Sequence, residues 1–94
     1  MSEKERQHEE VPVQNREEIY RMIEAEREFQ IELWGFQDDN TDQQWLSILT
    51  EEVGEFAKAI NDGHPILLKQ SELVQIAAVA VSAIESLNKR EVAQ

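Results

Sequence analysis

Apolar residues along this chain recur mostly at the three- and four-residue spacing of amphipathic helices, and they divide it into three helical segments. The first is predicted over about residues 15–34, with Asn15 as its N-cap and Gly35 as its stop. The second runs from about residue 41 to residue 62, where a Gly-His-Pro turn ends it. The third fills roughly residues 67–89. Because glycine is scarce and no alternating Val/Ile/Thr run occurs, strands have little support, and we expect an all-α fold.

The ends of the chain and its length indicate one small domain. Residues 1–13 are polar, carry charges of both signs and contain a proline, so we expect a flexible segment before a helical domain over residues 14–94. The first ten residues hold no apolar run of the kind found in signal peptides. The most apolar stretch, residues 73–84, is too short to span a bilayer. We therefore expect a cytoplasmic protein.

The charge balance limits the class of partner. The chain carries 20 acidic and 9 basic residues, a formal net charge of −11. No basic stripe is present to neutralise a phosphate backbone, which argues against a nucleic-acid polymer as partner. A nucleotide is still compatible with this charge, because a divalent metal can invert the local potential. The chain has no cysteine, which excludes disulfides, zinc-thiolate sites and thiol catalysis within it.

Three carboxylates crowd into the second helical segment, at Glu51, Glu52 and Glu55. At about 100° per residue, Glu52 falls at the edge of the apolar face and Glu55 one step further out. Glu51 lies farthest round, in line with Lys58, so Glu52 and Glu55 are the best candidates for an inward-pointing pair. The alternative is a charged, solvated helix shoulder. The apolar face is formed by Trp45, Ile48, Leu49, Val53, Phe56 and Ile60.

The third segment places a further acid in apolar surroundings. Its apolar residues wrap most of the way round the helix, and a helix of that kind is buried on nearly all sides. Glu72 and Gln75 share a face with Ile76 and Val79, so we expect both to point into packed surroundings. The alternative is that Glu72 only caps the helix start and Gln75 fills space. One three-helix chain is too thin to cover such a helix, and we expect an obligate homodimer or a dimer of dimers.

Taken together, these side chains predict a divalent metal site. Carboxylates brought together near a core repel one another and lose hydration, so they need a compensating cation. Oxygen-only ligands favour Mg²⁺ or Mn²⁺, which such sites share with substrate phosphates. The predicted ligands are Glu52, Glu55, Glu72 and Gln75.

The first segment contains a polar anomaly. Glu26 falls in the middle of its apolar face, and Gln30 sits beside it four residues later. Buried acids are uncommon unless they are paired, so Glu26 and Gln30 are expected to face the acidic cleft or its substrate, unless this face is simply wet. Trp34 and Trp45 can stack on a base, although a tryptophan in a small chain also serves as core.

Glu52-x-x-Glu55 followed by Glu72-x-x-Gln75 resembles the metal signature EExxE…ExxD of the MazG-like all-α nucleoside triphosphate pyrophosphohydrolases. The resemblance covers about residues 15–88 and includes the segment Trp34-Gly35-Phe36 before the metal helix. It implies Mg²⁺-dependent cleavage of a (deoxy)nucleoside triphosphate between the α and β phosphates, in the service of nucleotide-pool housekeeping. It also implies tight dimers that often pair into tetramers.

The chain departs from this family at Gln75, which stands where the pattern has Asp. A Gln oxygen can ligate Mg²⁺ but brings no charge, so metal binding before substrate arrives should be weaker. The expected catalytic residues are the ligands Glu52 and Glu55, with Glu51 or Glu55 orienting or deprotonating the attacking water. Lys58 can reach phosphate oxygens or serve as an exposed ion-pair partner. A nucleotide-binding module without catalysis and a purely structural helical dimer remain as alternatives.

Overall fold

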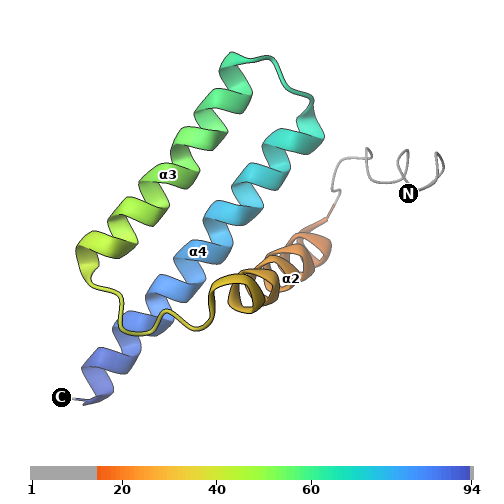
Figure 1. Cartoon of the computed structure of the whole chain (residues 1–94). Helices are drawn as coiled ribbons and strands as arrows, with labels where there is room; N and C mark the ends of the chain where they lie inside the picture. The colour runs from red at the N-terminus through yellow and green to blue at the C-terminus, as the bar shows by residue number, and fades with distance from the viewer. Residues whose placement is uncertain (1–14, 94) are drawn as a thin grey trace.

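The computed structural model describes residues 15–93, with side chains up to residue 91, and this part is entirely helical apart from its connections. Helix α2 spans Arg16–Trp34, α3 spans Asp42–Asn61 and α4 spans Ile66–Ala93. Helix α4 packs against both α2 and α3 (Figure 1). The all-α prediction is therefore confirmed. The expected flexible segment, residues 1–13, lies outside the described residues.

The helix ends follow the local signals in the sequence. The Asn15 side chain accepts a hydrogen bond from the Glu18 backbone N–H at 2.8 Å and caps α2. Gly35 ends this helix with a positive φ of 76°, a conformation that glycine adopts without strain. At the start of α3, Thr41 and Gln44 form a reciprocal capping box.

Helix α4 is longer than the sequence pattern predicts, since it begins one residue earlier and extends to Ala93. By length and composition, Ile66–Glu91 passes as a segment able to cross a membrane, although the apolar stretch within it is too short for this on its own. The core helix of a soluble bundle meets the same criterion. In the single chain Ala78, Val79 and Ser86 of this helix are buried, and Ile66, Leu68, Leu73, Ile84 and Leu87 are exposed.

The covered side of α3 differs from the predicted apolar face. Trp45 and Ala59 are buried, whereas Val53 and Ile60 are 48% and 50% exposed. Val53 and Ile60, at one side of the predicted apolar face, therefore lie outside the part of α3 that the single chain covers. Helix α4 packs against the side of α3 that carries Trp45, Glu52 and Ala59, which places Glu52 within the covered face instead of at its edge.

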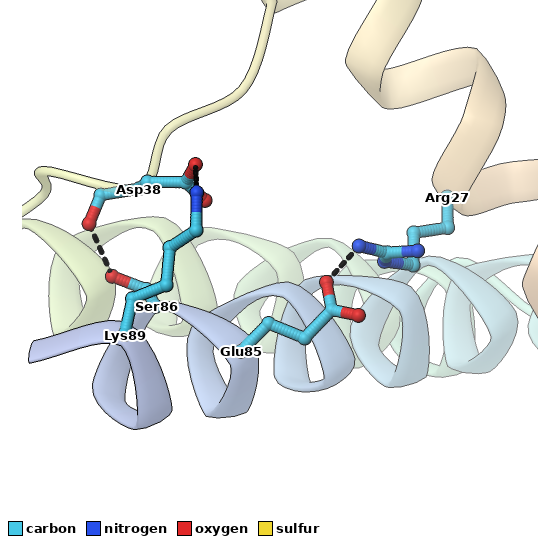
Figure 2. A network of polar contacts seen from close by, with 5 residues as sticks. All are labelled: Arg27, Asp38, Glu85, Ser86 and Lys89. Carbon is cyan, nitrogen blue, oxygen red and sulfur yellow. Dashed lines mark hydrogen bonds and ion pairs between the residues drawn. The ribbon is translucent and has the colours of Figure 1, made fainter. Parts of the chain in front are cut away.

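The connection between α2 and α3 is fastened to the C-terminal half of α4. Ser86, which is fully buried, donates a hydrogen bond from Oγ to the Asp38 carbonyl oxygen at 2.7 Å. The Lys89 ammonium pairs with the Asp38 carboxylate, so α4 holds both the backbone and the side chain of this residue (Figure 2). A further ion pair joins Arg90 to Asp42 at 2.8 Å. The two contacts to Asp38 fix the loop that lines the cavity described below, whereas the Arg90–Asp42 pair joins α4 to the start of α3.

Ser86→Ala should lower the free energy of unfolding by about 1–2 kcal/mol, because it leaves a carbonyl oxygen without its buried donor. Lys89→Ala removes only an exposed ion pair and should cost less than about 1 kcal/mol. Urea unfolding of both variants at one protein concentration measures the two effects. Equal midpoints for Ser86→Ala and the wild-type protein would contradict the structural role assigned to this hydrogen bond.

Candidate functional site

A cavity of about 280 Å³ opens between the three helices, on the side closed by the α2–α3 loop. This volume is near the lower end of the roughly 300–1,000 Å³ range of small-molecule sites. Its walls combine aromatic and aliphatic side chains with several carboxylates. The lining residues are Arg27, Gln30, Ile31, Trp34, Gly35, Phe36, Gln37, Asp38, Trp45, Ile48, Glu51, Glu52, Val79, Ser82 and Glu85.

The cavity brings together five of the residues that the sequence singled out: Gln30, Trp34, Trp45, Glu51 and Glu52. Gln30 is only 7% exposed, and its amide nitrogen donates to the Glu26 carboxylate at 3.2 Å. Glu26 itself is half-buried and lies outside the lining, so it holds the amide of Gln30 in position. Gln30 thus lines the cavity, as the sequence predicted, whereas Glu26 contacts it only through Gln30.

Carboxylates from all three helices repel the negative charge of Glu52. Its pKa is raised above the ordinary value, first because burial penalises the charged form and then because Glu55, Glu72, Glu26 and Glu51 repel it. Glu26 belongs to α2, Glu55 and Glu51 to α3, and Glu72 to α4. The structure thus surrounds Glu52 with negative charge and supplies no neutralising side chain among the causes of its shift.

Two carboxylate oxygens near this point have no hydrogen-bond partner. Glu52 Oε2 and Glu72 Oε2 are both buried and accept no hydrogen bond from any residue in the described part of the chain. A buried acceptor without a donor costs about 1–3 kcal/mol, and more when it is charged. A divalent cation would satisfy both oxygens, so the oxygen-only donor set is compatible with a metal ion.

The predicted metal ligands do not converge on one point. Within residues 15–91, no group of three or more His, Asp or Glu side chains is arranged to hold a metal ion. Repulsion among the carboxylates opposes their convergence when no positive charge lies between them. Gln75 is half-buried on α4 one turn beyond Glu72, and Glu55 is exposed on α3.

Lys58 faces away from the cavity lining. Its ammonium donates to the Asp62 carboxylate at 2.9 Å, and this hydrogen bond raises the pKa of Lys58. Of the two roles left open by the sequence, this contact fits the exposed ion pair. A role on phosphate would require the Lys58 side chain to leave Asp62.

The sequence reasoning missed the ion pair between Arg27 of α2 and Glu85 of α4, which both line the cavity. Helical spacing places Arg27 about 100° from Glu26, and nothing local identifies a partner 58 residues away in the chain. Ser82 of α4 and Phe36 of the loop were likewise not singled out for this lining. Only the packing of α2 on α4 brings these side chains together.

Comparison with protein-family models, with curated proteins and with solved structures found no match to this chain.

Proposed function

We propose that this protein is a Mg²⁺-dependent hydrolase that converts a (deoxy)nucleoside triphosphate to the monophosphate and pyrophosphate. The observation that carries the proposal is the pair of buried, unpartnered carboxylate oxygens of Glu52 and Glu72, beside a cavity with aromatic walls. The resemblance of the Glu52-x-x-Glu55 and Glu72-x-x-Gln75 motifs to the MazG-like family supports the same reaction. Mn²⁺ can replace Mg²⁺ in an oxygen-only site.

The position of each side chain suggests its role in the reaction. Glu52, Glu55 and Glu72, with the amide oxygen of Gln75, would hold the metal ion. A divalent cation held by these side chains would supply charge neutralisation to the triphosphate. Glu51 is exposed at the cavity wall, where its carboxylate can orient the attacking water and accept its proton.

The cavity suits the base of the substrate. Trp34 and Trp45 offer aromatic surface for stacking, and the buried Gln30 amide, held by Glu26, offers hydrogen bonding to a base edge. Because the carboxylates of Glu51 and Glu52 line the same cavity, the triphosphate and the metal would lie on that side. Base and phosphates would thus occupy neighbouring parts of one site.

Assembly as a dimer is part of the proposal. Two helices expose apolar rows at coiled-coil spacing, which are defined here as the α3 row and the α4 row. The α3 row is Leu46, Val53 and Ile60, at seven-residue intervals. The α4 row is Leu73, Ile84 and Leu87, with Ala77 and Ala80 between them at the intervening positions. A second copy of the chain would cover surface that a monomer leaves in water.

Incubation with each dNTP and Mg²⁺, followed by detection of pyrophosphate and monophosphate, tests the reaction. In ¹⁸O-labelled water the label should enter the monophosphate, because attack is expected at the α-phosphorus. Label in pyrophosphate or free phosphate would mean that another bond is cleaved. Saturable binding without products would identify a nucleotide-binding module instead, and neither binding nor turnover would leave a structural helical dimer.

Gln75→Asp should tighten Mg²⁺ binding by about tenfold or more, because it adds a charged ligand to the site. Isothermal titration of the metal into both proteins measures the change. Gln75→Glu adds the same charge on a longer side chain and serves as the control for position. Unchanged affinity in Gln75→Asp would argue against Gln75 as a ligand.

A further inference from the structure

The Arg27–Glu85 ion pair lies at the cavity and joins α2 to α4 (Figure 2). The two side chains differ in their access to solvent, since Arg27 is 17% exposed and Glu85 is 50% exposed. Arg27 uses one terminal guanidinium nitrogen for the pair. Glu85 therefore keeps an accessible carboxylate that can accept hydrogen bonds from a molecule in the cavity.

The charges of the lining disfavour an anionic group in the cavity unless a metal ion accompanies it. Glu51, Glu52, Glu85 and Asp38 contribute four carboxylates, and Arg27 is the single cation among the lining residues of the described chain. Since that cation is already paired with Glu85, the remaining potential is negative. The part of a ligand beside Arg27 and Glu85 is therefore neutral, whereas its phosphates need a metal ion on the Glu51 and Glu52 side of the cavity.

The walls favour a flat ring. Trp45 is buried at 7% exposure, whereas Trp34 and Phe36 are exposed and leave their rings open to a ligand. All three line the cavity, and aromatic faces stack well on planar heterocycles. A cavity of about 280 Å³ holds such a ring with a sugar, but not a large cofactor.

The Arg27–Glu85 pair offers the hydrogen-bonding groups that a ligand in the cavity can reach. The Glu85 side chain is 50% exposed and accepts hydrogen bonds, and the Arg27 guanidinium beside it is 17% exposed and donates them. Arg27 Nε and Trp45 Nε1 also have no acceptor within the described residues, but both atoms are closed to solvent. The pair can therefore offer a donor and an acceptor to one edge of a heterocycle.

We propose that the Arg27–Glu85 pair determines base specificity, and that the cavity binds the neutral nucleoside portion of the substrate without any metal. This deepens the proposed function and rests on it for taking a nucleobase as the ring. Metal would then be needed only for the phosphates, which the carboxylates otherwise repel. Ring recognition and phosphate recognition become separable parts of one site.

Tryptophan fluorescence provides a direct measurement, because both tryptophans of the chain line the cavity. The full-length protein is titrated in EDTA with each of the four deoxynucleosides, which carry no phosphate. We expect saturable quenching by at least one of them, with an affinity that Mg²⁺ changes by less than about twofold. No saturable change with any deoxynucleoside at millimolar concentration, or quenching that requires Mg²⁺, would overturn the proposal.

Variants distinguish a role of the Arg27–Glu85 pair in deoxynucleoside binding from a purely structural role in holding α2 against α4. Glu85→Gln should weaken deoxynucleoside binding about tenfold, as expected for loss of a charge-assisted hydrogen bond. Arg90→Gln breaks another ion pair of α4, with Asp42, outside the cavity lining, and should leave binding unchanged. The double variant Arg27→Glu/Glu85→Arg restores an ion pair in reverse, so it should keep the wild-type Tm but change the order of preference among the deoxynucleosides. An unchanged order, or equal weakening by Arg90→Gln, would overturn the assignment to this pair.

The outcome is distinguishable from failure of the hydrolase proposal. Deoxynucleoside binding that depends on Glu85, in a protein that releases no pyrophosphate from any dNTP, would support the ring site and contradict the hydrolase. Pyrophosphate release without deoxynucleoside binding would support the hydrolase and contradict the ring site.

Discussion

Glu52→Gln should abolish metal-dependent hydrolysis and at the same time make the metal-free protein more stable. Removing a ligand of the proposed site should lower kcat/KM by at least about 100-fold. The same change removes a half-buried charge that Glu55, Glu72, Glu26 and Glu51 repel, and we expect a gain on the order of 1 kcal/mol in the free energy of unfolding at neutral pH. Steady-state kinetics and urea unfolding in EDTA measure the two effects.

The stability gain has a defined pH dependence. Because the pKa of Glu52 is raised in the folded protein, the folded state holds this proton more tightly than the unfolded state. The contribution of Glu52 to the free energy of unfolding is therefore most favourable at a pH below 4.5, the ordinary pKa of this carboxyl. It declines as pH rises through the raised pKa of the folded state. The difference in the free energy of unfolding between Glu52→Gln and the wild-type protein should become smaller as pH is lowered toward 4.5.

Glu28→Gln provides the control for net charge, since it removes one carboxylate at an exposed position of α2. It should change neither activity nor stability appreciably. In excess Mg²⁺ the order of stability of the two proteins should reverse. At a metal concentration of 100 Kd, binding adds about 2.7 kcal/mol to the free energy of unfolding of the wild-type protein and far less to that of Glu52→Gln. A Glu52→Gln protein that is less stable than wild type in EDTA would show that this carboxylate is not strained by its neighbours.

Ile84→Glu in the α4 row should dissociate the protein and unfold it on dilution. A carboxylate placed in an apolar interface must be desolvated without a partner, which costs several kcal/mol and raises the dissociation constant by more than about 100-fold. Since few apolar side chains are buried in the described chain, a separated chain has little core to keep it folded. Sedimentation velocity and far-UV circular dichroism over a dilution series measure both consequences.

Val53→Glu in the α3 row should have the same effect, because it introduces a charge into the second apolar row. Ile84→Leu keeps the apolar character and similar volume of the side chain, so this control should remain a dimer with unchanged helicity. A wild-type protein that sediments as a stable, folded monomer at micromolar concentration would refute assembly through these rows.

Local signals in the sequence determined the three helices and most of their ends. Asn15, Gly35 and Thr41 act through contacts within a few residues, so their effects can be read without knowing the fold. The same holds for the inward phase of Glu26 and Gln30, because one turn of helix relates them. The length of α4 was underestimated, since a helix continues through polar residues when contacts such as Arg90–Asp42 hold it in place.

Only the tertiary structure decided how each helix is rotated against its neighbours. Several apolar residues of α3 could face inward, and the packing of α4 chose the side of Trp45 and Ala59, leaving Val53 and Ile60 outside. The Arg27–Glu85 pair and the fastening of Asp38 to α4 join residues distant in the chain, which periodicity within one helix cannot relate. Sequence spacing thus determined which side chains share a helix face, and the packing between helices determined which of those faces meet.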